Sequence, residues 1–177
     1  YIADKIAYMR RDAYDYHDFA VLYRTNSQSR AIEQALLRQN IPYRLVGGQS
    51  YFKRKEIKDL MAYLRLICNP DDDLSFVRVV NEPKRGIGAA SIDKLSHFAA
   101  ESELSLMSSI QDATGVVAKA TLNKLMDFKT MIYMLRAQIE DHSLASFIDL
   151  VLSQTGYLEM LENENTIEAD SRIDNLG

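Results

Sequence analysis

The chain has 177 residues, of which 47% are hydrophobic and 26% are charged, an ordinary globular composition that excludes intrinsic disorder as the default. No apolar run reaches the roughly 18 residues that a membrane span needs, and no secretory leader pattern opens the chain, so we expect a soluble, cytoplasmic protein. The single cysteine, Cys68, excludes an internal disulfide and a multi-cysteine zinc site. Its apolar surroundings predict that it is buried.

The formal charge of -4 is unevenly distributed along the sequence. Residues 1–139 carry 20 Lys and Arg against 16 Asp and Glu, whereas residues 140–177 carry one Arg against nine acids. A nucleic-acid-binding protein usually has a basic surface, and the acidity that argues against one is confined to the last part of the chain. The chain lacks an initiator Met and begins in a helical pattern, so we interpret both ends as cuts through a longer protein.

The first 54 residues predict a small α/β unit. Apolar residues at helical spacing open the chain, and a short apolar run at 19–23 is rich in strand-forming residues. A helix over 29–40 and a second strand at 43–46 follow. A strand, a helix and a strand of these lengths predict a βαβ unit, with parallel strands and a right-handed crossover.

The remainder, residues 55–177, predicts an all-helical subdomain. A helix over 55–68 ends at Asn69-Pro70, and Asp71 to Asp73 are candidate N-caps for a short helix whose buried residues we expect to be Leu74, Val77 and Val80. The further predicted helices cover 89–100, 104–110, 117–140 and 143–153. The fold class is therefore α+β but mostly α, with domains at 1–54 and 55–177.

No catalytic residue, metal site or cofactor site is predicted in this chain. The sequence lacks a phosphate-binding loop, a dinucleotide-binding glycine motif, a His-Glu-x-x-His zinc motif and a Gly-x-Ser-x-Gly nucleophile motif. The three histidines have no metal-ligand spacing, which is typical of solvated residues. Adjacent carboxylates after a proline, as at 71–73, more often cap a helix than bind a cation.

Residues 84–88 read Lys-Arg-Gly-Ile-Gly and precede an amphipathic helix. We expect Ile87 to be buried while the backbone of Gly86 and Gly88 stays uncovered, next to the free N–H groups of the following helix. Lys84 and Arg85 would then be countercharges for a phosphate, as in a helix-hairpin-helix-like turn that holds the DNA backbone without reading bases. The alternative is a plain interhelical turn with solvated Lys and Arg.

The end of the first predicted strand is a second candidate site. Ligands of parallel sheets bind beyond the carboxyl ends of strands, where this chain has a polar run from Arg24 to Arg30. Arg24 offers forked donors to a phosphate, and Asn26 can bond a sugar or a base edge. The alternative is an N-cap cluster for the next helix.

A basic run near the predicted domain boundary is the third candidate. It consists of Lys53, Arg54, Lys55 and Lys58. These side chains would either contact phosphates or brace a hinge.

These motifs occur in one order along the chain: residues 19–30, 47–59, 64–67, 69–73 and 83–88. The series resembles the UvrD/PcrA/Rep-like superfamily 1 DNA helicases over essentially the whole chain. Residues 108–129 match no motif of that family, so Lys119, Lys124 and Lys129 remain unassigned and are compatible with a solvated face.

The resemblance implies an ATP-driven motor that moves 3′ to 5′ on single-stranded DNA and unwinds duplex. It implies that residues 1–54 belong to the second RecA-like domain and 55–177 to its inserted helical accessory subdomain. ATP and Mg²⁺ would bind elsewhere in the parent protein, so this fragment would be inactive alone. Arg24 and Asn26 match positions that contact single-stranded DNA, and the positions that match duplex contacts are Lys84, Arg85, Gly86, Gly88 and Ser91.

Three hypotheses follow from these residues. The first is the DNA-binding and regulatory part of a helicase, with single-stranded and duplex DNA as partners and repair or transcription proteins as further ones. The second is a protein-docking or autoinhibitory module with little DNA affinity, for which the acidic tail and helical surface would suffice. The third, a free-standing DNA-binding protein, is disfavoured by the cut ends.

Overall fold

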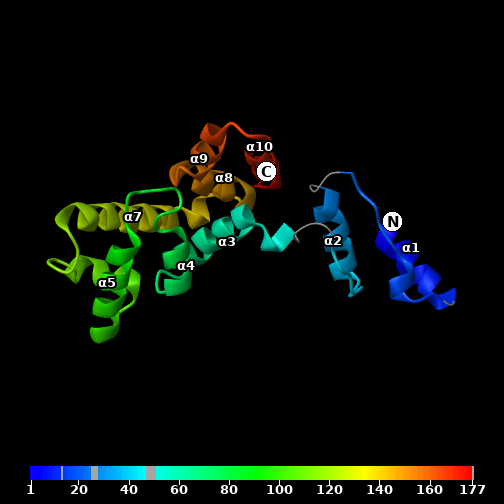
Figure 1. The fold of residues 1–177 in the computed structure, drawn as a ribbon, viewed down its shortest axis with the longest axis horizontal. Coiled ribbons are helices and arrows are strands. Elements are labelled where there is room, and N and C mark those ends of the chain that lie inside the picture. The colour runs from blue at the N-terminus through cyan, green and yellow to red at the C-terminus, as the bar shows by residue number, and fades with distance from the viewer. Residues whose placement is uncertain (13, 25–27, 47–50, 177) are drawn as a thin grey trace. The chain divides into compact units, whose positions relative to one another are not determined.

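The computed structural model describes residues 1–12, 14–24, 28–46 and 51–176 and is mostly helical (Figure 1). The chain forms two compact units: the N-terminal unit, residues 1–57 with 174–177, and the helical unit, residues 58–173. These units differ from the predicted domains in residues 55–57 and 174–177, and the domain assignment itself stays a prediction. Within the described residues, no helix is both long and apolar enough to cross a membrane.

The N-terminal unit has a small core between two helices. Helix α1 (Ile2–Met9) and helix α2 (Gln28–Arg38) bury Ile6 and Leu36, with Ile41 beside them. This spacing fits amphipathic helices that place one apolar stripe inward. The described residues of this unit also form short 3₁₀ turns, namely η1 (Arg10–Asp12), η2 (Tyr16–Asp18) and η3 (Tyr51–Lys53).

The predicted strands at 19–23 and 43–46 are not confirmed. Neither segment forms a β-ladder with any described residue, although Phe19 already has extended dihedrals (φ -103°, ψ 136°). The β signal among the described residues is one isolated bridge, between Thr114 and Val117. A strand exists only with a hydrogen-bonded neighbour, so strand-forming residues without one stay irregular.

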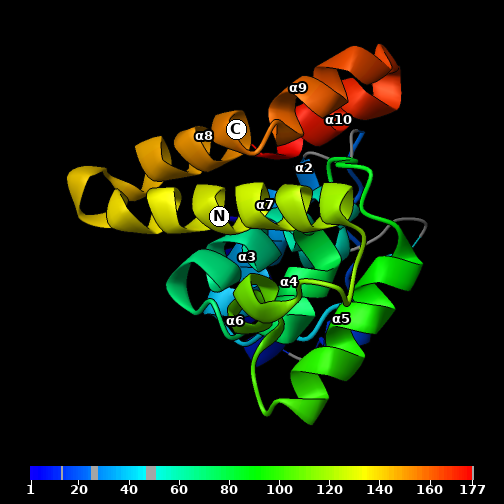
Figure 2. The same cartoon turned by 90° about the vertical axis from the view of Figure 1, so that its left-hand side faces the viewer.

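The helical unit contains most of the helices (Figure 2). Helix α5 packs against α6, and α6 packs against α4. Two helices belong to both units, because α3 begins and α10 ends in the N-terminal unit. With these two, the helices here are α3 (Lys55–Cys68), α4 (Asp73–Val79), α5 (Ala89–Glu101), α6 (Leu106–Ser109), α7 (Lys119–Ala137), α8 (Leu144–Gln154), α9 (Tyr157–Glu164) and α10 (Ile167–Leu176), with 3₁₀ turns η4 (Ile110–Asp112) and η5 (Ile139–Asp141).

Helix α3 has the predicted bounds, but Cys68 at its end is exposed, so the prediction of its burial is wrong. Leu66 and Ile67 take the buried positions and are both 0% exposed. The next residue lies about 100° further around the helix, and that turns Cys68 to solvent. Arg136 of α7 donates to the Cys68 carbonyl at 3.0 Å and so caps the C-terminal end of α3.

Helix α4 begins as predicted and buries a different face. The Asp72 side chain accepts from the Ser75 backbone N–H at 3.0 Å, which confirms the N-cap interpretation of the acidic run. Hydrogen bonds from the Ser75 side chain and then its backbone lower the pKa of Asp72. Leu74 and Val77 were predicted to be buried but are 87% and 51% exposed.

The larger aromatic residue explains the difference. Phe76 is fully buried and meets Phe128 of α7 edge to face, with ring centroids 5.6 Å apart. Because an aromatic pair contributes more than a Leu or Val contact at the same place, Phe76, Val79 and Val80 set the buried face of α4.

Candidate nucleic-acid interface

The segment that joins α4 to α5 contains the glycine turn, residues 84–91. Ile87 is 1% exposed, as predicted, while Gly86 and Gly88 are exposed on either side of it. Gly86 has φ +68°, the left-handed region that favours glycine, and Gly88 is the N-cap of α5 with φ -75°. Burying Ile87 contributes roughly 1.5–3 kcal/mol, which outweighs the roughly 0.5–1 kcal/mol entropy cost of a glycine.

The Asn81 side chain holds the turn from inside. Its Oδ1 accepts from the backbone N–H of Arg85 at 2.8 Å and of Ile87 at 3.2 Å. These two amides therefore point into the protein. The intervening Gly86 is left at the surface.

The start of α5 leaves donors open beside the turn. The N–H groups of Ser91 and Ile92 bond to the Gly88 carbonyl, at 3.0 and 3.3 Å. Those of Ala89 and Ala90 have no acceptor among the described residues, which is usual in the first turn of a helix. The exposed Lys84 belongs to the same segment, which therefore offers both backbone donors and a cation to an anion.

Arg85, predicted as a countercharge, is directed into the protein. Its Nη1 donates to the carbonyls of Val79 (3.1 Å), Val80 (3.4 Å) and Pro83 (3.1 Å). Its Nη2 donates to the Tyr63 hydroxyl at 2.9 Å and to the Thr155 carbonyl at 3.0 Å. The guanidinium carbon also lies 5.1 Å from the centre of the Phe128 ring.

Tyr63 completes this polar joint below the turn. The residue is 1% exposed, and its hydroxyl lies 2.6 Å from the Glu82 carbonyl, to which it donates. Burial raises the pKa of Tyr63 to about 12, although the Arg85 charge acts in the opposite direction. The phenol therefore stays protonated well above neutral pH.

Lys124, one of the lysines that sequence reasoning left unassigned, contacts the glycine turn. It projects from α7, and its Nζ donates to the Gly86 carbonyl at 3.2 Å. It is exposed, so its ammonium group and Lys84 are both on the solvent side of the turn. A separation of 38 residues hides such a neighbour from any local pattern.

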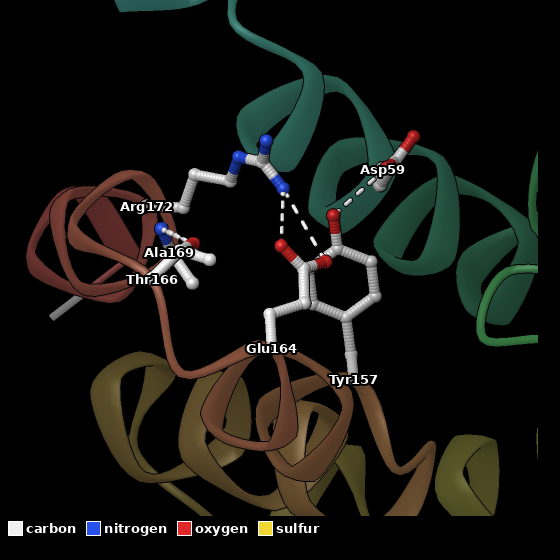
Figure 3. A network of polar contacts seen from close by, with 6 residues as sticks. All are labelled: Asp59, Tyr157, Glu164, Thr166, Ala169 and Arg172. Atoms are coloured by element: carbon white, nitrogen blue, oxygen red, sulfur yellow. Dashed lines mark hydrogen bonds and ion pairs between the residues drawn. The ribbon is translucent and has the colours of Figure 1, made fainter.

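A second polar cluster, around Asp59, was also missed. Figure 3 shows the Tyr157 hydroxyl directed at Asp59, to which it donates at 2.8 Å. Arg78 pairs with the same carboxylate at 2.7 Å, and the Asp59 side chain is 2% exposed. A buried carboxylate needs such partners, so this cluster ties α3, α4 and α9 together.

The ion pair between Arg172 and Glu164 joins α10 to α9 in the same view (Figure 3). Their closest approach is 3.1 Å. The one basic residue of the acidic tail is therefore used inside the tail.

The predicted single-strand site is only partly described. Arg24 is exposed, and its backbone N–H donates to the Gln28 side chain at 3.0 Å, at the start of α2. Asn26 lies outside the described residues. Whether these positions contact DNA or cap the helix stays a prediction.

The basic run at 53–58 divides into different environments. Lys53, Lys55 and Lys58 are exposed, whereas Arg54 is half-buried. Arg54 donates to the Asn175 side chain and, at 3.2 Å, to the Ser29 hydroxyl. It also lies over the Tyr51 ring, with the guanidinium carbon 5.6 Å from the centroid.

Around Arg54 the polar groups form one network within the N-terminal unit. The Tyr51 hydroxyl donates to the Asn175 carbonyl at 2.7 Å, and the Asn175 side chain donates to Glu56 at 2.7 Å. Arg54 therefore braces the junction between η3 and the end of α10, while a phosphate role for the exposed lysines stays a prediction.

Among the described residues, no group of three His, Cys, Asp or Glu side chains could hold a metal ion. The glycines of the turn are not followed by the Gly-Lys-Ser/Thr sequence that binds nucleotide phosphates.

Comparison with known proteins identifies the family. Residues 1–164 match the UvrD-like helicase C-terminal domain. The chain is 39% identical to ATP-dependent DNA helicase PcrA of Staphylococcus aureus (strain NCTC 8325 / PS 47) over 177 residues, 99% of this chain and 24% of that protein. Over 161 residues it is 49% identical to PcrA of Bacillus subtilis (strain 168), covering 90% of this chain and 22% of that protein.

A third relative, PcrA of Leuconostoc citreum, is 46% identical over 164 residues, 91% of this chain and 22% of that protein. The chain thus spans about a quarter of the length of these relatives. The resemblance inferred from the motifs is confirmed. The chain belongs to the UvrD-like helicase C-terminal domain family.

Proposed function

We propose that this chain is the DNA-binding and regulatory part of an ATP-dependent helicase that moves 3′ to 5′ on single-stranded DNA. Its relatives are named ATP-dependent DNA helicases, and it covers about a quarter of their length. ATP and Mg²⁺ would bind to other parts of the parent protein. The fragment alone would therefore hydrolyse no ATP.

The N-terminal unit would be the part that contacts single-stranded DNA. Its segments 19–23 and 43–46 flank α2 in the order of a βαβ unit, and other strands of the parent's RecA-like sheet would pair with them. Arg24 and Asn26 would then lie at a carboxyl edge of that sheet, where ligands bind. The exposed side chain of Arg24 supports this role.

The helical unit would hold duplex DNA through the glycine turn, as a helix-hairpin-helix-like element. One observation carries this proposal: Gly86 and Gly88 are exposed beside unpaired N–H groups and Lys84, while Ile87 between them is buried. Backbone donors and a lysine can bind phosphate oxygens of any sequence. Ser91, half-buried in the first turn of α5, would add a polar side chain to this contact.

Fluorescence anisotropy of a labelled duplex with the full chain tests this contact. We expect a dissociation constant at or above roughly 10⁻⁴ to 10⁻⁶ M at physiological salt, because few phosphates are engaged. Replacing Lys84 by alanine should weaken binding several-fold and leave the thermal midpoint unchanged, since the side chain is exposed.

Lys129→Ala is the matched control for that experiment. It also removes one positive charge, but from a different place. Lys129 is on α7, five residues after Lys124, and its side chain leaves the helix about 140° around from that of Lys124. Duplex binding that ignores salt, or that falls equally in both variants, would reject the glycine turn as the contact.

The alternative is a protein-docking or autoinhibitory module. A shallow hollow on α7 favours it, because Tyr133 and Met134, two of the residues that line it, are 44% and 63% exposed. Repair or transcription proteins would be the partners. This alternative gains support if the full chain shows no salt-dependent duplex binding at all.

A further inference from the structure

Arg85 and Lys124, two of the cations at the glycine turn, differ in what they already bind. Arg85 comes directly before Gly86 in sequence, yet both of its terminal nitrogens donate to acceptors inside the protein. Lys124 is 38 residues away, yet its ammonium group lies on the turn. The sequence therefore suggests Arg85 as the cation available to a phosphate, whereas the structure suggests Lys124.

The acceptors of Arg85 are groups that need a donor. Val79 and Val80 end α4, and Thr155 is the C-cap of α8, so their carbonyls lack partners within their own helices. The negative ends of the two helix dipoles also favour a cation there. The Val79 carbonyl has a second donor, the Glu82 backbone N–H at 3.1 Å. Turning Arg85 toward DNA would remove the guanidinium donor from the Val80 and Thr155 carbonyls and from the buried Tyr63 hydroxyl, at a cost for each group.

Lys124 has the opposite properties. It is exposed, and it bonds one acceptor, the Gly86 carbonyl, at 3.2 Å. An ammonium group has three donors, so Lys124 can keep this bond and still donate to a phosphate oxygen beside the turn. Lys84 is exposed on the same turn.

We propose that Lys84 and Lys124 are the cations that contact duplex phosphates, and that Arg85 is a positioning residue that fixes the turn against α4 and α8. This inference rests on the proposed duplex contact. It assigns a DNA-binding role to Lys124, which the motifs left unassigned. It also withdraws the direct phosphate contact from Arg85.

The salt dependence of duplex affinity separates contact from positioning. Each phosphate contact that is lost lowers the slope of log affinity against log salt by about 0.9, a change of about three- to fourfold in the affinity ratio between 50 and 200 mM salt. We expect this decrease in Lys84→Ala and in Lys124→Ala, with thermal midpoints near that of the unchanged chain. Lys129→Ala should keep the full slope.

Two substitutions of Arg85 test its role. Lysine keeps the charge and would preserve a phosphate contact, but it lacks the planar fork that reaches carbonyls on two helices. If Arg85 positions the turn, Arg85→Lys and Arg85→Gln should lower the thermal midpoint and weaken duplex binding to the same extent. If Arg85 contacts phosphate, Arg85→Lys should bind like the unchanged chain and Arg85→Gln should not.

The outcomes distinguish this inference from the proposed function. Binding restored by Arg85→Lys, normal binding in both Arg85 variants, or an unchanged slope in Lys124→Ala would overturn the inference while duplex binding stands. If the chain without substitutions shows no salt-dependent duplex binding, the proposed function is overturned as well. If both Arg85 variants lose helical circular dichroism, Tyr63→Phe is measured instead, because it removes an acceptor of Arg85 and keeps the guanidinium. Weakened duplex binding by Tyr63→Phe would support the positioning role of Arg85, and normal binding would contradict it.

Discussion

Gly86 and Gly88 are separated by one residue but have different reasons to be glycine. Gly86 has φ +68°, and a Cβ there would lie 2.6 Å from the Lys124 ammonium nitrogen. Gly88 has φ -75°, and apart from its chain neighbours no described residue has an atom within 4 Å of where its Cβ would be. The first position is therefore constrained by the fold, and the second is open on its outer side.

We predict that Gly86→Ala lowers the free energy of unfolding by about 1–2 kcal/mol, the cost of a left-handed residue with a Cβ. Gly88→Ala should change it by less than about 1 kcal/mol, because a weaker N-cap is offset by lower chain entropy in the unfolded state. Yet Gly88→Ala should weaken duplex binding, since its methyl group covers the backbone where a phosphate approaches. Urea unfolding and duplex anisotropy measure the two effects.

Equal destabilisation by the two alanines would contradict the backbone conformations of the turn. Normal duplex binding by Gly88→Ala would contradict the approach of phosphate to this backbone.

For single residues, the sequence predicts those properties that depend on neighbours along the chain. The burial of Ile87 and the exposure of the flanking glycines follow from their alternation, and the structure confirms them. The direction of Arg85 depends on Tyr63 and Thr155, which are 22 and 70 residues away. Lys124 could be found only once α7 was known to pass the turn.

Helices α3, α4 and α8 meet at a joint that contains a titratable group. Tyr63 of α3 donates to the Glu82 carbonyl after α4 and accepts from Arg85, which also holds the Thr155 carbonyl at the end of α8. The folded pKa of Tyr63 is about 12, against an ordinary value of 10.0. The folded state therefore favours the protonated phenol.

This difference predicts a loss of stability at high pH. Below pH 10 the Tyr63 phenol is protonated in the folded and the unfolded state, and its contribution to the free energy of unfolding is complete. Between pH 10 and 12 only the unfolded chain releases this proton, so the free energy of unfolding falls by roughly 2–3 kcal/mol. We expect the unchanged chain to be more stable than Tyr63→Phe near pH 8, and this advantage to shrink as the pH rises through that range. Urea unfolding followed by circular dichroism, at several pH values, measures both proteins.

Because both proteins are measured under the same conditions, contributions that they share cancel in the comparison. An advantage that stays constant from about pH 8 to 12 would show that Tyr63 has no raised pKa.

Helix positions were the most predictable elements, because apolar spacing and cap residues act within a few turns. The bounds of α3 and the cap of α4 followed from Asn69-Pro70 and Asp72. The buried face of α4 did not follow, because it depends on Phe128 of α7. The strands predicted at 19–23 and 43–46 are not confirmed for a related reason, since no described segment pairs with them.

For the whole chain, the charge distribution is consistent with the proposed duplex contact. The excess of acid lies in residues 140–177, while the glycine turn and its lysines lie in the basic part. Membership of the UvrD-like helicase C-terminal domain family could be predicted because its motifs are local and ordered along the chain. Contacts between distant residues, such as Lys124 with Gly86, are recorded by no local pattern.

Duplex binding through the glycine turn is tested most directly with two labelled duplexes of unrelated sequence and the full chain, with anisotropy measured at about 50 and 200 mM salt. Contact through backbone amides and lysines predicts equal affinities for the two duplexes and a clear fall in both at the higher salt. A preference for one duplex, or affinity that does not change with salt, would contradict it.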